Sequence, residues 1–236
     1  MFIKVTLICF FISVLLLFIN CMFCVSYQET GSTYGHVISY DFENNNRNLI
    51  LSLQKQYQND DIVGVLRISN TDFEVLVVQG DDNDYYLSHG YMKEDNSFGT
   101  VFLDYRVNLD DSRKLLLYGH SSSVLDLSFN FLENYYDELF YQQHPYLEFI
   151  SDEQVGKYEI FSVYVETSDF SYMRLNFLND EDFMKHVLSL KSKSIYDTGV
   201  VFYDIDQILI LQTCSNHVDY QNYLNKYLLI VARRIE

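Results

Sequence analysis

The sequence is poor in basic residues. Its 16 lysines and arginines are outnumbered by 33 acidic residues, which gives a net charge of -17. A protein that follows the phosphates of a nucleic acid needs a basic face, so this balance argues against nucleic-acid binding. An acidic exterior is compatible with a soluble, well-solvated domain.

Cysteine is also scarce. Of the 4 cysteines, all but Cys214 lie before residue 25. The main part of the chain therefore has neither a disulfide framework nor a metal site built from several cysteines. A lone thiol is either a small packed hydrophobe or a nucleophile. For an exported protein, in which an unpaired thiol is open to oxidation, the second reading gains ground.

We predict no cofactor and no metal. The acidic turn that contains Asp81, Asp82 and Asp84 has oxygen ligands that could gather calcium. Solvated acidic turns are more common than calcium sites, so we interpret this one as a turn.

One long hydrophobic run lies near the start of the chain. Residues 5–25 are almost wholly apolar, and about 20 such residues suffice for a helix to cross ~30 Å of hydrocarbon. No small-residue cleavage site follows, so we predict an uncleaved transmembrane anchor over residues 5–26. Lys4 supplies a weak charge bias that places residues 1–4 in the cytoplasm. Residues 27–47 then form a stalk, and residues 48–236 form one extracellular domain of a single-pass protein of the cell membrane.

Hydrophobic periodicity predicts three helices in this domain. Leu49, Ile50, Leu53 and Tyr57 recur at helical spacing within residues 42–57. A second helical pattern covers residues 124–141, and a third follows the acidic start at residues 179–182. The face predicted for the second helix consists of Leu125, Phe129, Leu132, Tyr136 and Leu139.

Short β-rich runs separated by turn residues make up most of the remainder. Many short strands with a few inserted helices, and no regular alternation of strand and helix, predict a closed or nearly closed β-barrel decorated with helices. The predicted strands cover residues 62–68, 73–78, 100–103, 114–118, 158–165, 207–213 and 227–233.

Cys214 lies at the end of an apolar run that starts at Gln207 and reads as a buried strand. An unperturbed thiol has a pKa near about 8.5 and is mostly protonated at neutral pH. A nucleophilic cysteine therefore needs a base or a charge partner.

His120 is the best candidate for that base. It directly follows the apolar strand 114–118, so a rigid element delivers it to a strand end, and Gly119 permits a sharp turn there. Two buried strands, one ending in Cys214 and the other in His120, form the arrangement that nucleophilic catalysis requires. The alternative to a catalytic role is that His120 is a surface histidine that happens to follow a strand.

The other histidines are weaker candidates. We predict that His36 in the stalk and His186 within a helix face solvent. His89 and His144 lie in or beside loops and have no evident partner in the sequence. His217 follows the cysteine by three residues, but two ligands alone do not make a metal site.

With these residues in place, the sequence resembles the sortases, and among them class B. The histidine motif reads Leu117-Tyr-Gly-His120 and the cysteine motif reads Leu211-Gln-Thr-Cys214. Further similar segments occur in the same order, and together they cover roughly residues 48–235. They comprise residues 59–64, 77–87, 99–104, 140–145, 158–164 and the helix before 194–196.

This resemblance implies a membrane-anchored cysteine transpeptidase of a Gram-positive cell surface. It implies an eight-stranded β-barrel with an amphipathic helix before it and a long helix before the cysteine strand. By analogy, Cys214 attacks a threonine carbonyl in the sorting signal of a surface protein and forms a thioester. His120 acts first as general acid and then as general base for the acceptor amine of a peptidoglycan precursor or a pilin. Hydrolysis by water is the side reaction.

One departure from the family pattern concerns the last strand. Sortases carry an arginine there that holds the substrate and stabilises the oxyanion, and the corresponding position here is Tyr227, preceded by Lys226. Arg233 lies six positions further along, roughly 20 Å at ~3.3 Å per residue, and is too distant to replace it. Loss of a charged oxyanion donor costs about 3–4 kcal/mol, or a factor of about 10² to 10³ in rate. Smaller departures are Ile210 and Ser121, where the family more often has Thr and Asn.

Two alternative hypotheses follow. The first is a catalytically weakened sortase fold that binds sorting motifs or cell-wall strands without efficient turnover, which Tyr227 motivates. The second is an exported thiol hydrolase whose products ignore added amine.

Overall fold

The computed structural model describes residues 46–152, 155–202 and 204–236. The predicted anchor (residues 5–26), the cytoplasmic tip, His36 and nearly all of the predicted stalk lie outside these residues. No helix in the described ranges has both the length and the apolar character needed to span a membrane.

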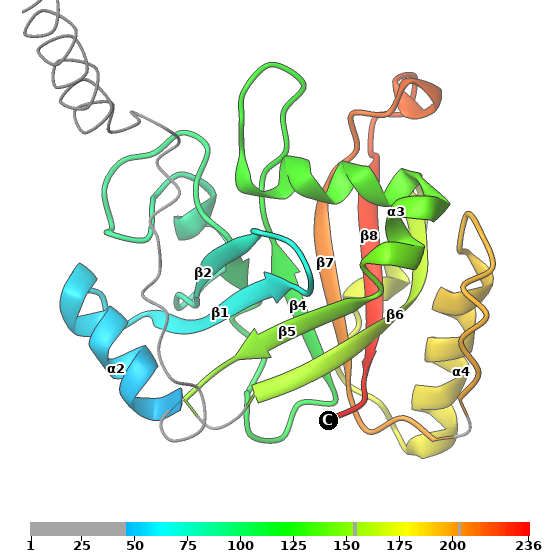
Figure 1. Cartoon of the computed structure of the whole chain (residues 1–236), viewed down its shortest axis with the longest axis horizontal. Helices are drawn as coiled ribbons and strands as arrows, with labels where there is room; N and C mark the ends of the chain where they lie inside the picture. The colour runs from blue at the N-terminus through cyan, green and yellow to red at the C-terminus, as the bar shows by residue number, and fades with distance from the viewer. Residues whose placement is uncertain (1–45, 153–154, 203) are drawn as a thin grey trace, which may run out of the picture. The chain divides into compact units, whose positions relative to one another are not determined.

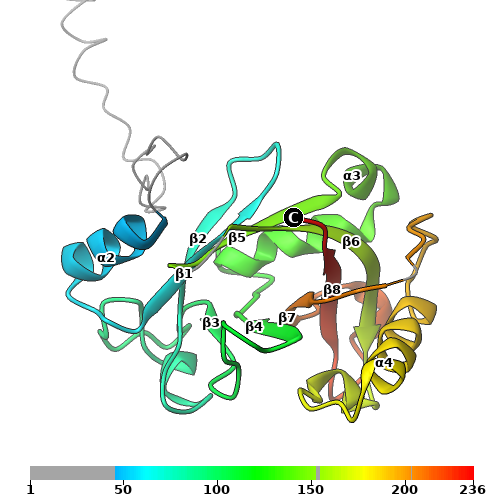
Figure 2. The ribbon, with the colours of Figure 1, turned by 90° about the horizontal axis from the view of Figure 1, so that it is seen from below.

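Eight strands form a closed barrel, as predicted. Around the barrel they follow the order β1-β2-β3-β4-β7-β8-β6-β5. Figures 1 and 2 show the barrel from two directions. Only the β2–β3 and β4–β7 pairs are parallel. The strands are β1 (Ile62–Ile68), β2 (Glu74–Val78), β3 (Phe102–Leu103), β4 (Lys114–Tyr118), β5 (Tyr146–Ile150), β6 (Val155–Glu166), β7 (Ile208–Cys214) and β8 (Tyr227–Arg234).

Helices cover parts of this barrel. Helix α2 (Asn46–Tyr57) buries the predicted apolar face, with Leu49, Ile50 and Leu53 all at or below 5% exposure. Helix α4 (Asp180–Ser192) is capped at its N-terminus by Asn179, whose side chain accepts a hydrogen bond from the backbone N–H of Asp182. The helix packs along the outside of β6 (Figure 1).

The prediction of one α-helix over residues 124–141 was wrong. The segment forms a 3₁₀ helix, η2 (Ser128–Tyr136), and then a short α-helix, α3 (Glu138–Gln143). The residues that η2 buries are Phe129, Leu132 and Tyr135, three positions apart, which is the period of a 3₁₀ helix. Leu125 and Leu139, placed on the buried face by α-helical spacing, are 40% and 64% exposed.

Strand β5 was not predicted. It has five residues and starts directly after Pro145, the chain's single proline. Its strand conformation is a consequence of tertiary pairing, because it bonds to β1 on one side and to β6 on the other.

Side-chain alternation separates the inside of the barrel from its outer face. The hydrophobic core holds Leu115 and Leu117 of β4, Leu209 and Leu211 of β7, and Leu228 of β8. Neighbouring side chains on a strand point to opposite sides, so the residues that alternate with these core residues along each strand face outward. That set includes Lys114, Tyr118, Gln212, Cys214 and Tyr227. The candidate site therefore lies on the outer face of the barrel.

Candidate active site

The parallel pairing of β4 with β7 brings His120 and Cys214 together. Tyr118 pairs with Gln212, and the Gly119 amide donates to the Gln212 carbonyl at 3.1 Å. His120 and Cys214 each follow this pair by two residues, on the same face. Adjacent strands lie about 4.8 Å apart. The imidazole and the thiol thus leave the same end of two neighbouring strands.

Gly119 is required for a close approach rather than for the sharp turn that we predicted. A Cβ atom at this position would lie 2.6 Å from the Phe129 ring. Phe129 is fully buried in the core beneath the segment that follows β4. The absence of a side chain at Gly119 therefore lets the backbone that carries His120 sit directly on η2.

His120 is half-buried, and its ring is oriented by one backbone contact. Its Nε2 lies 3.2 Å from the Leu87 carbonyl oxygen. A carbonyl oxygen only accepts, so in the neutral ring Nε2 carries the proton and Nδ1 remains free as a base. Within the described part of the chain, no hydrogen bond joins His120 to Cys214. The resting site therefore holds both groups ready without a bond between them.

Cys214 is a free, exposed cysteine at the end of β7. Although the residue is exposed, atoms around the sulfur desolvate it, and this burial raises the pKa of the Cys214 thiol while the charge of Lys226 acts in the opposite direction. A raised pKa keeps the group as a thiol at neutral pH. To act as a nucleophile, such a thiol needs a base at the moment of attack, and His120 is the candidate for that role.

Tyr227 lies directly opposite Cys214, since the two residues are cross-strand partners in the β7–β8 ladder. Its ring meets Phe170 edge to face with 6.1 Å between centroids. Arg233, at the far end of β8, pairs with Ile208 and donates to the Glu159 carboxylate at 2.6 Å. Position 227 thus faces the thiol with a neutral phenol, and Arg233 is committed elsewhere.

A second set of contacts joins the segments that follow His120 and Cys214. The Asn216 side chain donates to Ser121 Oγ at 2.6 Å, and Ser121 Oγ donates to Asn130 at 3.0 Å. The backbone N–H of Asn216 also donates to the Glu133 carboxylate at 2.9 Å. Ser121, which looked like a minor departure from the family, therefore bridges the histidine and cysteine segments.

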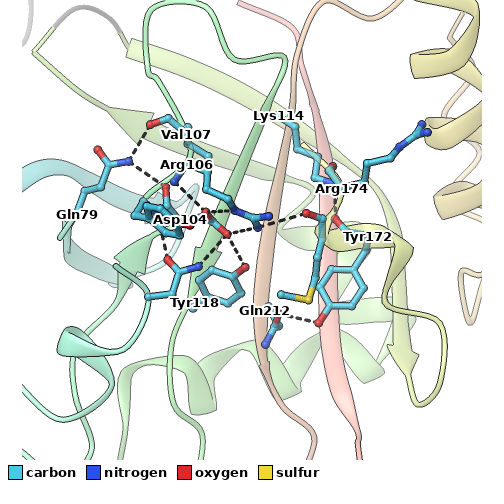
Figure 3. Close-up of polar contacts among 12 residues, drawn as sticks. Gln79, Asp104, Arg106, Val107, Lys114, Tyr118, Tyr172, Arg174 and Gln212 are labelled. Carbon is cyan, nitrogen blue, oxygen red and sulfur yellow. Dashed lines mark hydrogen bonds and ion pairs between the residues drawn. The ribbon is translucent and has the colours of Figure 1, made fainter. Parts of the chain in front are cut away.

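The outer face beside the site carries a buried ionic network, drawn in Figure 3. Asp104 is fully buried and accepts from Arg106 at 2.6 and 2.8 Å, and from the Tyr118 hydroxyl at 2.8 Å. Burial by itself raises the pKa of Asp104, but the hydrogen bonds, foremost those from Arg106, outweigh it and hold that pKa below its usual value. The network fixes Tyr118, two residues before His120.

Tyr172 covers the neighbouring part of this face. It belongs to the 3₁₀ helix η3 (Phe170–Met173), is 1% exposed, and donates its hydroxyl to the Gln212 side chain at 2.8 Å. Burial, followed by the negative charges that Tyr227, Glu166 and Cys214 can carry, raises the pKa of Tyr172. Its phenol therefore stays protonated next to the thiol.

Tyr118, Gln212 and Tyr172 were not predicted as site residues. The first two stand within the motifs themselves, two residues before His120 and Cys214, and side-chain alternation alone puts them on the same face as these residues. Tyr172 had no such signal, because its position depends on how the loop after β6 folds back.

The other four histidines within the described residues have structural contacts. His186 was predicted to face solvent, and this was wrong: it is 7% exposed, on the side of α4 that packs against the barrel. His89 stacks on Tyr85 at 4.0 Å, and His144 Nδ1 lies 3.3 Å from the Ser69 carbonyl. His217 caps the short helix η4 (Val218–Tyr220) by accepting from the Asp219 amide.

Comparison with known proteins extends this description. The chain is 35% identical to sortase B of Listeria monocytogenes over 176 residues, which cover 74% of this chain and 70% of that protein. A Staphylococcus aureus sortase B–substrate complex superposes with a TM-score of 0.72 at 31% identity, over 82% of this chain and 87% of that chain. A sortase B complexed with triglycine gives a TM-score of 0.73 at 31% identity, over 82% and 88%. No protein-family model matches the chain.

The barrel and its similarity to these proteins define a cysteine transpeptidase of the sortase fold. Within that class, the chain belongs to the sortase B family.

Proposed function

We propose that this protein is a membrane-anchored transpeptidase that cleaves the sorting signal of surface proteins and joins the new carboxyl end to an amine. The observation that carries the proposal is the in-register placement of His120 and Cys214 at one end of two bonded parallel strands. Sortase B complexes with a substrate and with triglycine are known, which supports peptide partners for this chain as well. The membrane anchor is supported by the apolar run at residues 5–25 alone.

In the first half-reaction, Cys214 Sγ adds to the carbonyl carbon of the scissile bond while its proton passes to His120. The C–N bond then breaks, His120 protonates the leaving amine, and a thioester remains on Cys214. In the second half-reaction, His120 removes a proton from the acceptor amine, which attacks the thioester and releases the Cys214 thiol. The acceptor is an amine of a peptidoglycan precursor or of a pilin.

Desolvation of Cys214 favours this sequence of events. Because burial raises the pKa of the thiol, a stable thiolate does not accumulate before the peptide arrives. Proton transfer to His120 accompanies attack, and the same ring then holds the proton that the leaving amine needs.

A second candidate function rests on Tyr227. A neutral phenol opposite Cys214 cannot supply the charge that the family arginine gives to an oxyanion, and Arg233 is bonded to Glu159. A sortase fold with this change would bind sorting motifs or cell-wall strands with little turnover.

Product analysis separates these functions. The domain, residues 48–236, is incubated with a panel of sorting peptides, with and without an added amine, and the products are identified by mass spectrometry. Amine-dependent ligation that is lost in Cys214→Ala supports the transpeptidase. Binding without any cleaved product favours the weakened fold, and cleavage that ignores the amine identifies a hydrolase.

A further inference from the structure

Lys114 is a lysine buried in the wall of the barrel. It opens β4, faces outward, and has 0% exposure beneath the loop that follows β6. Burial, with smaller contributions from the charges of Arg174 and Arg106, lowers the pKa of Lys114 to about 7. No carboxylate among the described residues bonds to it. An ammonium group in such a place is costly unless every proton has an acceptor.

Each proton of the Lys114 ammonium has one. Nζ donates to the Tyr172 carbonyl, to the Arg174 carbonyl at 2.7 Å, and to His186 Nε2 at 3.2 Å. Burial and then the charge of Lys114 lower the pKa of His186 to about 3, so the ring is neutral and can accept. Three donors thus meet three neutral acceptors, and two of these are backbone oxygens of a single loop.

Arg106 contacts the carbonyl of Met173, the residue between Tyr172 and Arg174. Its Nη2 donates to the Asp104 carboxylate at 2.6 Å and also lies 3.4 Å from the Met173 oxygen, and its Nε donates to Asp104 as well (Figure 3). Two cations from one side of the barrel therefore hold three consecutive carbonyls, those of Tyr172, Met173 and Arg174.

The other end of the same loop is also fixed. Lys193, just after α4, bonds to Glu166 and Asp169 at 2.7 Å each. Residues 167–174 are thus anchored at both ends, and we call this segment the η3 loop.

The η3 loop places two aromatic side chains beside the candidate site. Tyr172 bonds through its hydroxyl to Gln212, two residues before Cys214. Phe170 packs edge to face on Tyr227, the cross-strand partner of Cys214. Any movement of the three carbonyls moves these rings relative to the thiol.

We propose that Lys114 is a positioning residue for the transpeptidation reaction: it holds the η3 loop so that Tyr172 and Phe170 form one wall of the groove that receives the sorting peptide next to Cys214. This role rests on the proposed function. Lys114 does not touch the substrate and acts through the backbone of the loop.

A matched control is Lys191 in the last turn of α4, which contacts a different loop. Lys191 also donates to a backbone carbonyl, that of Val200, and lies over the Phe202 ring at 5.2 Å. That loop packs near Arg233, at the end of β8 remote from Tyr227. Lys191→Met removes the same kind of contact without reaching the candidate site.

The first test needs no substrate. The Arg174 side chain is 43% exposed and accessible to trypsin, but its carbonyl is held by Lys114, so cleavage after Arg174 requires the loop to open. We expect Lys114→Met to speed this cleavage at least about tenfold, and Lys191→Met to leave it unchanged. Lys114→Gln, which keeps two N–H donors, should restore part of the protection. Equal cleavage in a folded Lys114→Met variant would overturn the proposal.

The second test measures turnover of a sorting peptide. We expect Lys114→Met to raise KM by about tenfold with little change in kcat, because the groove wall is displaced while His120 and Cys214 stay in place. Tyr172→Phe should weaken binding in the wild-type and Lys191→Met backgrounds but add little in Lys114→Met. Additive effects of the two substitutions would contradict action through the loop.

Two further outcomes are informative. If Lys114→Met does not fold, Lys114→Gln and Arg106→Gln are compared instead. Arg106→Gln releases the Met173 carbonyl together with the Asp104 carboxylate and leaves the bonds of Lys114 in place. Unchanged cleavage after Arg174 in both variants overturns the proposal. If no peptide is turned over, the proposed function fails, and the trypsin result still decides whether Lys114 holds the loop.

Discussion

The two sides of the candidate site are built differently. On the β4–β7 side, a ladder of backbone hydrogen bonds sets the positions of His120 and Cys214. On the β8 side, position 227 is fixed just as firmly opposite Cys214, but the side chain there is a tyrosine. Backbone pairing determines where a group stands, whereas one side chain determines the charge it offers. The candidate site thus combines the proposed nucleophile and base with a tyrosine at position 227, where the family pattern has an arginine.

The largest effect is expected on the intact side. His120→Ala removes the base and the acid of both half-reactions, so kcat/KM for amine-dependent ligation should fall by about 10² to 10⁴. His144→Ala serves as the control and should keep full activity, because His144 contacts Ser69 and not the ends of β4 and β7 that carry the site. Equal losses in both variants would show that His120 has no special role.

A gain is expected on the β8 side. Tyr227→Arg places a cation opposite Cys214, and a charged oxyanion donor is worth about 10² to 10³ in rate. Tyr223→Arg adds the same charge at a 52% exposed position in the loop before β8, and it should change the rate less than about twofold by surface electrostatics alone. A slower Tyr227→Arg enzyme would mean that the phenol itself contributes to this site.

The stability of the protein in acid tests the buried contact between His186 and Lys114, which lies under the η3 loop. The pKa of His186 is lowered from 6.5 to about 3 by burial and by Lys114. Between these values the unfolded chain binds a proton that the native state does not, so the free energy of unfolding decreases as the pH falls through this window. The contribution is at most about 1.4 kcal/mol per pH unit.

Urea titrations from pH 4 to 7 measure this contribution. His186→Gln keeps a neutral acceptor for Lys114 and does not titrate, so its stability should fall less steeply with acid than that of the wild type. Asn134→Ala, which removes no titratable group, should retain the wild-type slope. Identical slopes in all three proteins would contradict a neutral, buried His186.

The smallest effect concerns the bridge between the two strand ends. Asn216→Ala removes the bond to Ser121, which should cost about 0.5–1.5 kcal/mol of stability and reduce kcat severalfold. Asn134→Ala, which removes a local bond to the Phe131 carbonyl on the exposed side of η2, should be neutral for turnover. Thermal melts and peptide kinetics on the same samples provide both numbers.

Much of the barrel was predictable from sequence. The runs that became β1 and β4 have the predicted bounds, because apolar β-rich segments between turns carry their own signal. Strand β5 and helix η2 did not follow the local pattern: β5 is made by its neighbours, and η2 takes a period of three to fit its rings into the core. Tertiary packing decided both.

The candidate site was predictable to a similar extent. Cys214 and His120 lie at strand ends, where the pattern placed them. The role of Lys114 was hidden, since a lysine at the start of a strand usually faces solvent and its three acceptors come from segments far along the chain. His186 was misplaced although helical spacing could have located it, because it shares the i, i+3, i+4, i+7 stripe of α4 with the buried Phe183, Val187 and Leu190.

The acyl-enzyme on Cys214 tests the central claim most directly. The domain is mixed with a sorting peptide, quenched in acid, and measured by intact mass spectrometry followed by mapping of the modified peptide. We predict a mass increase equal to the acyl fragment, located on Cys214, removed by added amine and absent in Cys214→Ala. An adduct that never forms, or one that forms equally in Cys214→Ala, would contradict the account.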